Sequence, residues 1–192
     1  MSEEIETSTD AAAGLSPLFA GESGLTVSQR CWRILAPKWA YNPLSGAGAA
    51  RFGGRFNPKG IPALYLSETI DTAFAEYQQD LLVRPGTFCA YQVDVIGIVD
   101  LCNAQVCKAV SVDRETLLSP WKEILLVQQR TPPTWDLSLQ LLNQGFAGVR
   151  VPSVQREAGV NIVLWRWNDD PSRQVSVLDP QGELPRDQTS WR

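Results

Sequence analysis

Hydrophobic and polar residues follow one another along the chain in short runs that predict both strands and helices. Residues 88–95 alternate strictly, with Cys89, Tyr91, Val93 and Val95 on one side, which is typical of a half-buried strand. Further strands are predicted at residues 29–35, 61–66, 97–101, 146–151, 161–167 and 174–178.

A helical period follows the strand that ends near Tyr65. Ser67 or Thr69 is suited to cap this helix, and one face of it is expected to pack on the core through Ile70, Ala73, Phe74, Tyr77 and Leu81. Glu76 falls just beyond the edge of that apolar stripe. Two later helices are predicted, one opened by Ser119 and Pro120 and running to Gln129, the other from Thr134 to Asn143 and closed by Gly145.

Strands and helices are mixed without a regular strand–helix–strand repeat, so the pattern predicts an α+β fold with a largely antiparallel sheet. Residues 36–60 are rich in proline and glycine and are expected to form a long loop. We expect a flexible leader at residues 1–26, one domain at 27–180 and a polar C-terminal tail at 181–192.

Composition describes an ordinary soluble globular protein, with 44% hydrophobic and 20% charged residues. No apolar run approaches the roughly 18 residues that span a bilayer, and no signal-peptide pattern opens the chain, so a cytoplasmic protein is the simplest interpretation. The net charge of −4 comes from four acids within residues 1–10, which leaves 17 acids against 17 bases elsewhere. A neutral body argues against a nucleic-acid-binding face.

The chain of 192 residues contains no histidine, which excludes Ser-His-Asp and Cys-His catalytic systems and most zinc sites. The four cysteines, Cys31, Cys89, Cys102 and Cys107, form no Cys-x-x-Cys pair. We therefore predict buried free thiols and no metal site. Any chemistry must use Arg, Glu, Asp, Ser, Tyr, Lys or Cys.

Several residues suit a site for an anionic ligand, although each also has a purely structural explanation. Arg33 lies within an apolar strand, and Arg55 follows the paired Gly53 and Gly54, a loop in which backbone N–H groups and a guanidinium can hold phosphate oxygens. Either arginine can equally be a solvated surface side chain. Tyr65 can stack on a flat ring or pack at the rim of the core. Glu76 can be a surface acid and Ser153 a turn residue. Trp121, Trp135, Trp165 and Trp167 are expected to be packing residues, with the last two on one face of a strand.

The order of these residues nevertheless resembles the RES domain, a family named for its arginine, glutamate and serine. The resemblance covers roughly residues 29–180 and rests on Arg33, the loop from Gly53 to Gly60, Leu64 to Ser67, Glu76 and Val151-Pro152-Ser153 followed by Asn161. It implies a fold similar to ADP-ribosyltransferases, with antiparallel sheets flanked by helices and an NAD cleft between them. Family members are toxins of toxin–antitoxin pairs.

The resemblance also implies a role for each site residue. Arg33 and Arg55, with Gly54 and Phe56 of the loop, would hold the pyrophosphate and ribose of NAD. Tyr65 would stack on nicotinamide, and Glu76 would stabilise the positive charge that develops as the glycosidic bond opens. Ser153 would hydrogen-bond the substrate and Asn161 would support the pocket floor. Nicotinamide leaves as a neutral molecule, so the reaction suits a chain without histidine.

Three hypotheses follow for the function. The first is a toxin that degrades NAD with water or phosphate as acceptor, and the second is an ADP-ribosyltransferase that modifies a protein. The third is an inactive module that binds a nucleotide or a partner. The resemblance implies that the partner is an antitoxin with an Xre-type helix-turn-helix or an immunity protein. We expect no metal and no binding to nucleic acid or membrane, and a homo-oligomer is compatible with the sequence. The toxin would act in the cytoplasm of its own cell, or of a recipient cell if it is delivered.

Overall fold

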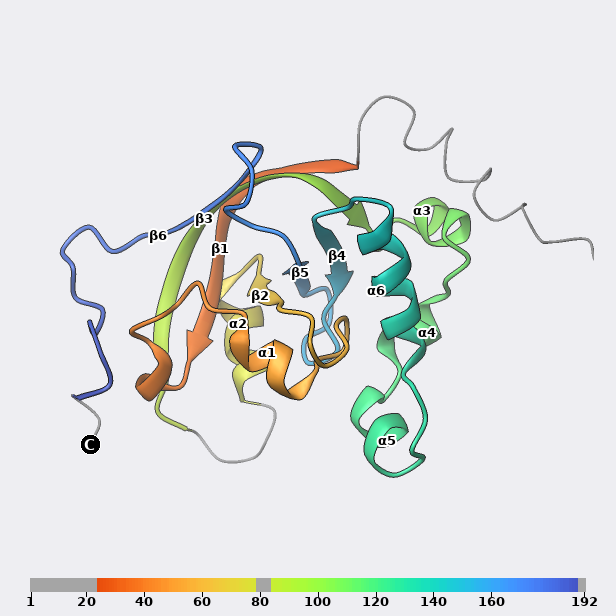
Figure 1. Cartoon of the computed structure of the whole chain (residues 1–192), viewed down its shortest axis with the longest axis horizontal. Coiled ribbons are helices and arrows are strands. Elements are labelled where there is room, and N and C mark those ends of the chain that lie inside the picture. The colour runs from red at the N-terminus through yellow and green to blue at the C-terminus, as the bar shows by residue number, and fades with distance from the viewer. Residues whose placement is uncertain (1–23, 79–83, 190–192) are drawn as a thin grey trace, which may run out of the picture.

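The structure, a computed structural model, describes residues 24–78 and 84–189 (Figure 1). The strands are β1 (Leu25–Leu35), β2 (Leu64–Ser67), β3 (Thr87–Asp100), β4 (Gly148–Pro152), β5 (Val160–Leu164) and β6 (Arg173–Val177). The helices are η1 (Pro37–Trp39), α1 (Ala47–Phe52), α2 (Ile70–Tyr77), α3 (Ala104–Ala109), α4 (Arg114–Leu118), α5 (Trp121–Leu126) and α6 (Pro133–Asn143).

The sheet closes on itself. Its strands follow the order β1-β2-β5-β4-β3, and β1 pairs with β3 to complete a barrel. The β3–β4 pair is parallel and the other pairs are antiparallel, which confirms the α+β prediction with a largely antiparallel sheet. Residues 91–95 of β3 also pair with β6, on the edge not used by β1. Instead of separate sheets with a cleft between them, as the resemblance implied, the chain forms one closed sheet.

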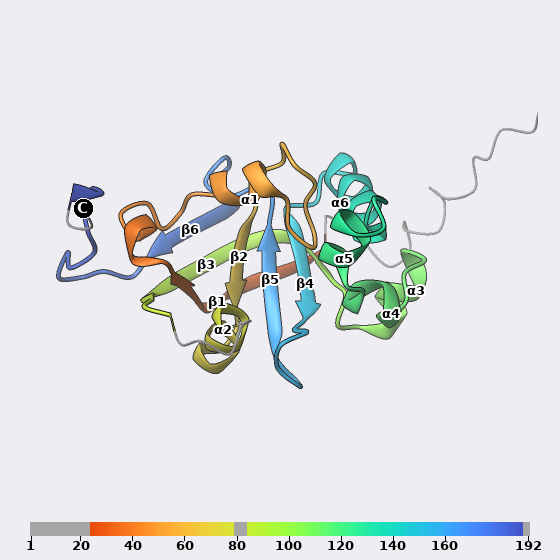
Figure 2. The same cartoon turned by 90° about the horizontal axis from the view of Figure 1, so that it is seen from below.

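Two hydrophobic clusters lie on opposite faces of these strands. The interior cluster contains Leu64 and Leu66 of β2, Ile162 and Leu164 of β5, and the alternating Cys89, Tyr91, Val93 and Val95 of β3, so the pattern predicted for β3 is confirmed. The outer cluster covers the other face of β4 and β5, where Val149, Val151 and Val163 pack against the helices α3, α4 and α6. Those helices lie together beside β4 (Figure 2). The same strands therefore serve two cores.

A charged group lies on the interior side of the strands at one end of the barrel. Arg150 of β4 donates from Nε and Nη2 to the two carboxylate oxygens of Glu68, at 2.7 and 3.1 Å, and from Nη1 to Asp100 at 3.1 Å. The hydrogen bonds to Glu68 raise the pKa of Arg150. A bidentate guanidinium–carboxylate pair fixes relative orientation as well as distance, so this group ties the ends of β2, β3 and β4 together.

Several predicted boundaries differ from the structure. Residues 36–60 contain η1 and α1 rather than a continuous loop. The strands predicted at 88–95 and 97–101 form the single strand β3, in which Gly97 adopts a φ of 91° and lets the strand continue past a bend. The pattern did not predict α3 or α4, and Ser119 ends α4 rather than capping α5. Both are short helices of five or six residues, for which a helical period is hard to recognise.

Helix α2 begins as predicted but buries a different face. Thr69 is the N-cap and accepts the N–H of Thr72 at 3.2 Å, which confirms the cap. Ile70 and Phe74 are 50% and 44% exposed, whereas Thr72 and Ala73 are buried. The predicted apolar stripe is therefore confirmed at Ala73 and wrong at Ile70 and Phe74, because α2 is turned so that Thr72, Ala73 and Glu76 face the rest of the protein. Leu81 lies outside the described residues.

The leader and tail are only partly described. Strand β1 starts at Leu25, within the last two residues of the expected leader, and residues 1–23 lie outside the description. After β6, Leu184 packs against the interior cluster. Within residues 24–78 and 84–189, no helix is long and apolar enough to cross a membrane.

All four cysteines are free. Cys31 and Cys89 are buried as predicted, but Cys102 is exposed and Cys107 is half-buried. Both follow the end of β3, where the chain leaves the barrel for the short helix α3, so the prediction of burial was wrong for Cys102.

Candidate active site

The loop after α1 is built around the side chain of Asn57, which is fully buried. Its Nδ2 donates to the carbonyls of Ala49 and Ile61 at 3.0 and 2.9 Å, and its Oδ1 accepts the Tyr65 hydroxyl at 2.7 Å. The same hydroxyl accepts the N–H of Phe56 at 3.1 Å. Burial raises the pKa of Tyr65, so the phenol stays protonated and donates to Asn57. These bonds fix the loop and the Tyr65 ring against each other.

Gly54 is required by this packing. A Cβ at Gly54 would lie 2.5 Å from Asn57 Oδ1 and 2.9 Å from Cζ of Tyr65, both closer than real side chains approach. The loop closes on itself through the Gly54 N–H, which donates to the Asn57 carbonyl at 2.9 Å. The paired glycine of the sequence therefore serves close approach of a tyrosine as well as a turn.

Side chains next to the outer cluster hold the backbone of this loop. Trp135 Nε1 donates to the Gly54 carbonyl at 2.7 Å, Trp165 Nε1 donates to the Phe56 carbonyl at 2.8 Å, and Thr134 donates to the Arg55 carbonyl. Phe56 itself is 3% exposed and belongs to the outer cluster. Trp165 is thus a core residue with a specific polar role. Trp167 packs against the interior cluster instead, so the prediction that both tryptophans share a face was wrong.

Arg55 extends from the loop toward the junction of α4 and α5, where Nη1 donates to the Ser119 carbonyl. Burial lowers the pKa of Arg55, and the nearby Glu76 and Tyr65 oppose that shift. The guanidinium therefore lies within electrostatic reach of Glu76 while it holds the start of α5 in place.

Glu76 is held by side chains from two other segments. Its Oε1 accepts Ser153 Oγ at 2.7 Å and Asn161 Nδ2 at 2.6 Å, whereas no described residue donates to Oε2. The Oδ1 of Asn161 accepts the hydroxyl of the buried Ser67 at 2.7 Å, which fixes the amide so that its N–H groups face Glu76. Contrary to the expected edge position, Glu76 lies on the α2 face that meets the sheet.

Ser153 holds both Glu76 and its own turn. Its Oγ accepts the backbone N–H groups of Gln155 and Arg156, each at 3.1 Å. Arg156 pairs with Asp71 at 3.0 Å, which adds a second tie between this turn and α2. One hydroxyl therefore holds the turn, as the turn interpretation expected, and also contacts Glu76.

Arg33 lies apart from this group. It shares the β1 parity of Cys31, which belongs to the interior cluster, and its Nη1 lies 3.4 and 3.5 Å from the carbonyls of Ser45 and Pro43. Burial lowers the pKa of Arg33, and Tyr91 and Cys89 oppose the shift. The guanidinium therefore faces the barrel interior, while Tyr65 and Glu76 lie on the outer face.

Two cavities meet at Glu76. The larger lobe, about 420 Å³, is lined by residues that include Gly54, Arg55, Phe56, Trp121, Lys122 and Val154. The smaller lobe, about 210 Å³, is lined by residues that include Trp32, Arg33, Ser67 and Tyr77. Tyr65, Glu76 and Asn161 line both. Together they form one hollow in two parts, with the Glu76 carboxylate at the junction.

A third cavity, about 720 Å³, lies between α3–α4 and residues 152–160. It is larger than either lobe and includes Ser153, but neither Glu76 nor Tyr65 lines it. In the described part of the chain, no three acidic or cysteine side chains come together as a metal site. We therefore take the two lobes at Glu76 as the site, since that is where the polar side chains converge.

The structure thus brings Gly54, Arg55, Phe56, Tyr65, Glu76, Ser153 and Asn161 together and turns the Arg33 guanidinium away. Asn57 was expected only as part of the loop motif, Ser67 only as a possible helix cap, and Trp121 only as a packing residue. Asn57 and Ser67 flank Tyr65 within the most specific motif, which was a signal in their favour. For Trp121, nothing local indicated that α5 borders the site.

Comparisons with known proteins agree with this architecture. The RES domain model matches residues 30–187. The chain belongs to the RES domain family. It is 27% identical over 149 residues to proteins named NAD(+) phosphorylase MbcT from Mycobacterium bovis and Mycobacterium tuberculosis, covering 71% of this chain and 72% of theirs. In fold, this RES domain resembles a chain in the crystal structure of the M. tuberculosis MbcT–MbcA toxin–antitoxin complex, with a TM-score of 0.59, 22% identity, and coverage of 87% of this chain and 93% of that chain.

Proposed function

We propose that this RES domain protein is a toxin that cleaves the nicotinamide–ribose bond of NAD, with phosphate or water as acceptor. The observation that carries the proposal is the Glu76 carboxylate, held by Ser153 and Asn161 at the junction of two cavities. The bond to be cleaved joins nicotinamide to the rest of the dinucleotide, so a carboxylate beside that bond needs space for nicotinamide on one side and for the remainder on the other. The relatives named NAD(+) phosphorylase support the same substrate.

The reaction requires stabilisation of positive charge more than proton transfer. As the bond between ribose C1′ and the nicotinamide nitrogen lengthens, its electron pair goes to nicotinamide, which leaves neutral, and C1′ becomes cationic. An oxygen of phosphate or water then forms the new bond to C1′, and water loses a proton in doing so. A fixed carboxylate beside C1′ stabilises the cation without reorganising during the reaction. Glu76 has that fixed position, because Ser153 and Asn161 both hold Oε1, and we assign Oε2, to which no described residue donates, to the developing charge.

The other residues take roles that follow from their contacts. Tyr65 presents a ring of fixed orientation for nicotinamide to stack on, and Arg55 supplies charge for the pyrophosphate. Gly54 and Phe56 shape the wall of the larger lobe. Ser153 and Asn161 position Glu76 in this structure, rather than contacting substrate first. Arg33 lines the smaller lobe, but its guanidinium must leave the Pro43 and Ser45 carbonyls to reach the pyrophosphate.

The proposal includes a protein partner. The similar chain of M. tuberculosis is described in a toxin–antitoxin complex with MbcA, which supports a cognate antitoxin here. The Xre-type helix-turn-helix of that antitoxin, the ADP-ribosyltransferase-like relationship of the fold and a cytoplasmic site of action complete the proposal. They rest on the family resemblance.

Product analysis tests the reaction and its acceptor. Purified protein would be incubated with NAD, with and without phosphate, and the products separated by chromatography and mass spectrometry. We expect nicotinamide release, with ADP-ribose 1-phosphate formed when phosphate is present. ADP-ribose alone would assign water as acceptor. If the purified protein leaves NAD intact but ADP-ribosylated protein forms when a lysate is added, protein modification would replace the proposal. If NAD stays intact and no adducts form, a binding module would remain.

A further inference from the structure

We infer that Trp121, at the start of α5, is the residue on which the adenine ring of the substrate stacks. This inference rests on the proposed function and adds the recognition of the half of NAD that does not react. It begins from the division of the site into two lobes that share Tyr65, Glu76 and Asn161. If Glu76 stands beside the ribose that loses nicotinamide, one lobe holds nicotinamide and the other holds the remainder of the dinucleotide.

The charge distribution decides which lobe holds which half. Arg55 lines the larger lobe and not the smaller one, and it lies within electrostatic reach of Glu76. Arg33 lines the smaller lobe, but its guanidinium lies against carbonyls on the interior side. The pyrophosphate is therefore expected beside Arg55, and the adenosine beyond it in the larger lobe. That lobe also has twice the volume of the smaller one, in keeping with the larger half of the molecule.

Among residues 24–78 and 84–189, three aromatic side chains line the larger lobe. Phe56 is 3% exposed and packed in the outer cluster, and Tyr65 is committed to the junction by its bonds to the loop. Trp121 is half-exposed and has no place in either hydrophobic cluster. The Lys122 ammonium lies over its ring, 5.9 Å from the centroid, and the indole still offers a flat aromatic surface on which a base can stack, as is common in nucleotide recognition.

The position of Trp121 is set by the same arginine that would hold the pyrophosphate. Arg55 donates to the carbonyl of Ser119, two residues before Trp121. Helix α5 buries none of its own side chains, and Leu126 and Val127 at its far end are 71% and 75% exposed. The packing of α5 thus gives no structural reason for a tryptophan at its start, whereas the backbone N–H of Trp121 donates to the same Ser119 carbonyl at 2.8 Å, which places Trp121 next to the residue expected to hold the pyrophosphate.

Val154 adds an apolar surface from another segment. It lines the larger lobe and is 38% exposed, at the turn that Ser153 holds. An adenine on Trp121 would therefore lie between α5 and the turn that positions Glu76. The turn at Ser153 and Val154 would then both contact the adenine and position the Glu76 carboxylate.

Substrates with and without adenine provide the test. NAD and nicotinamide mononucleotide contain the same bond to be cleaved, but the mononucleotide lacks the adenylate. Base stacking on an aromatic side chain is worth roughly 1–3 kcal/mol, and every 1.4 kcal/mol is a factor of ten. For Trp121→Ala we expect a rise of about ten-fold in KM for NAD with kcat retained, and no change in kcat/KM for the mononucleotide. Trp121→Phe should recover most of the loss.

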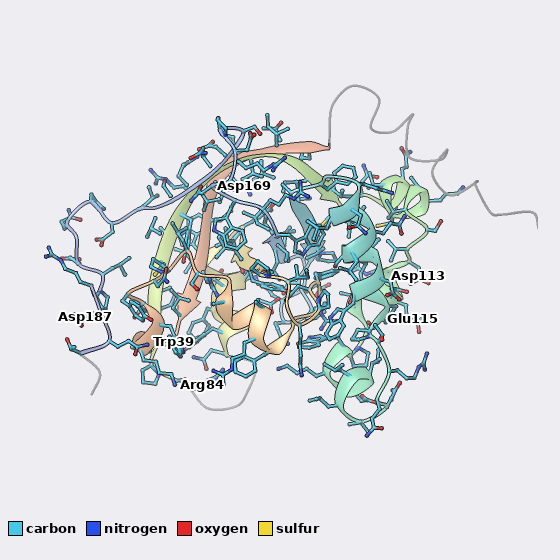
Figure 3. All side chains as sticks on the ribbon, in the orientation of Figure 1. Trp39, Arg84, Asp113, Glu115, Asp169 and Asp187 are labelled. Atoms are coloured by element: carbon cyan, nitrogen blue, oxygen red, sulfur yellow. The ribbon has the colours of Figure 1, made fainter. Side chains whose placement is uncertain are left out.

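Trp39 supplies the matched control. It is 50% exposed on η1 and lies far from α5 (Figure 3), so Trp39→Ala should change neither substrate. Equal losses on both substrates, or no loss on NAD, would overturn the adenine site. Calorimetry of ADP binding distinguishes a failure of the adenine site from a failure of the proposed function. Should the wild type leave NAD intact, ADP binding that weakens in Trp121→Ala still supports the adenine site, and equal binding to both proteins rejects it.

Discussion

Along β2 and β5, successive residues point alternately to the interior and to the outer face. The contacts on these two faces differ in kind. On the interior face, Leu64, Leu66, Ile162 and Leu164 are at most 1% exposed and belong to the interior hydrophobic cluster. On the outer face, Ser67 bonds Asn161, which bonds Glu76, while Tyr65 bonds Asn57 of the loop. Because β2 pairs with β5 in register, each outer residue is flanked by neighbours whose side chains anchor the strand inside.

This division separates stability from activity. Interior positions contribute mainly through burial and packing, which depend on volume. Outer positions near Glu76 contribute to activity by orienting its carboxylate. Loss of one of their hydrogen bonds moves the carboxylate but opens no large cavity. Substitutions on the two faces should therefore be distinguishable by comparing unfolding with kinetics.

The largest effect on stability is expected from the interior. Leu164 is fully buried, so Leu164→Ala should lower the free energy of unfolding by about 3 kcal/mol through lost burial and a residual cavity. The part of the sample that remains folded should keep its kcat. Urea unfolding measures the loss, with Leu139→Ala, an exposed position on α6, as the control. An equally large effect at Leu139 would contradict the assignment of the core.

The loop around Gly54 should combine both effects. Gly54→Ala forces a Cβ against Tyr65 and Asn57, and overpacking of this kind costs typically 1–3 kcal/mol. We expect reduced stability together with a higher KM for NAD, because the Tyr65 ring must move. Gly48→Ala is the matched control, since nothing lies within 4 Å of a Cβ at that helical position. It should be neutral or slightly stabilising, and unchanged kinetics in Gly54→Ala would refute the close-packing argument.

The hydroxyls that position Glu76 should affect kinetics more than stability. Ser153→Ala removes a direct bond to Oε1, and Ser67→Ala removes the bond that orients Asn161. A hydrogen bond to a charged group contributes about 1.5–3 kcal/mol, so we expect kcat to fall at least ten-fold for Ser153→Ala and less for Ser67→Ala. Ser138 is the control, because its hydroxyl bonds a helix carbonyl away from the site. Ser138→Ala should leave kcat unchanged, and a loss of kcat there equal to that of Ser153→Ala would argue against positioning.

The smallest effect is expected at the exposed pair between Asp169 and Arg173, which lies at the connection between β5 and β6 (Figure 3). Surface ion pairs contribute roughly 0–1 kcal/mol, so Asp169→Asn should shift the urea midpoint little and leave turnover intact. A large change in the urea midpoint or in turnover would mean that this connection contributes to the interior packing or to the site.

Part of this arrangement was predictable from the sequence. The period-2 pattern predicted the interior face of β3, and the order of loop, strand and helix predicted that Arg55, Tyr65 and Glu76 lie close together. Closure of the sheet was not predictable, because it depends on the β1–β3 pairing between residues some sixty positions apart. Local periodicity carries no information on such a pairing.

At two places the neighbouring element decides which side faces inward. On α2, Ala73 of the predicted apolar stripe is buried, but Thr72 is buried as well, whereas Ile70 and Phe74 of that stripe are exposed. On β1, strand parity turns the Arg33 guanidinium to the interior, although Arg33 also lines the smaller lobe, so its role in the site stays a prediction. Neither orientation follows from the local sequence pattern alone.

The rate of nicotinamide release by Glu76→Gln, compared with Glu68→Gln and the wild type, tests the central claim most directly. Both carboxylates belong to the β2–α2 segment, but Glu68 pairs with Arg150 on the interior side, whereas Glu76 stands at the junction of the two lobes. Loss of a fixed charge-stabilising group costs about 10²–10³ in kcat. We predict such a loss for Glu76→Gln, with turnover retained by Glu68→Gln. Turnover retained by Glu76→Gln, in a protein that unfolds like the wild type, would contradict the account.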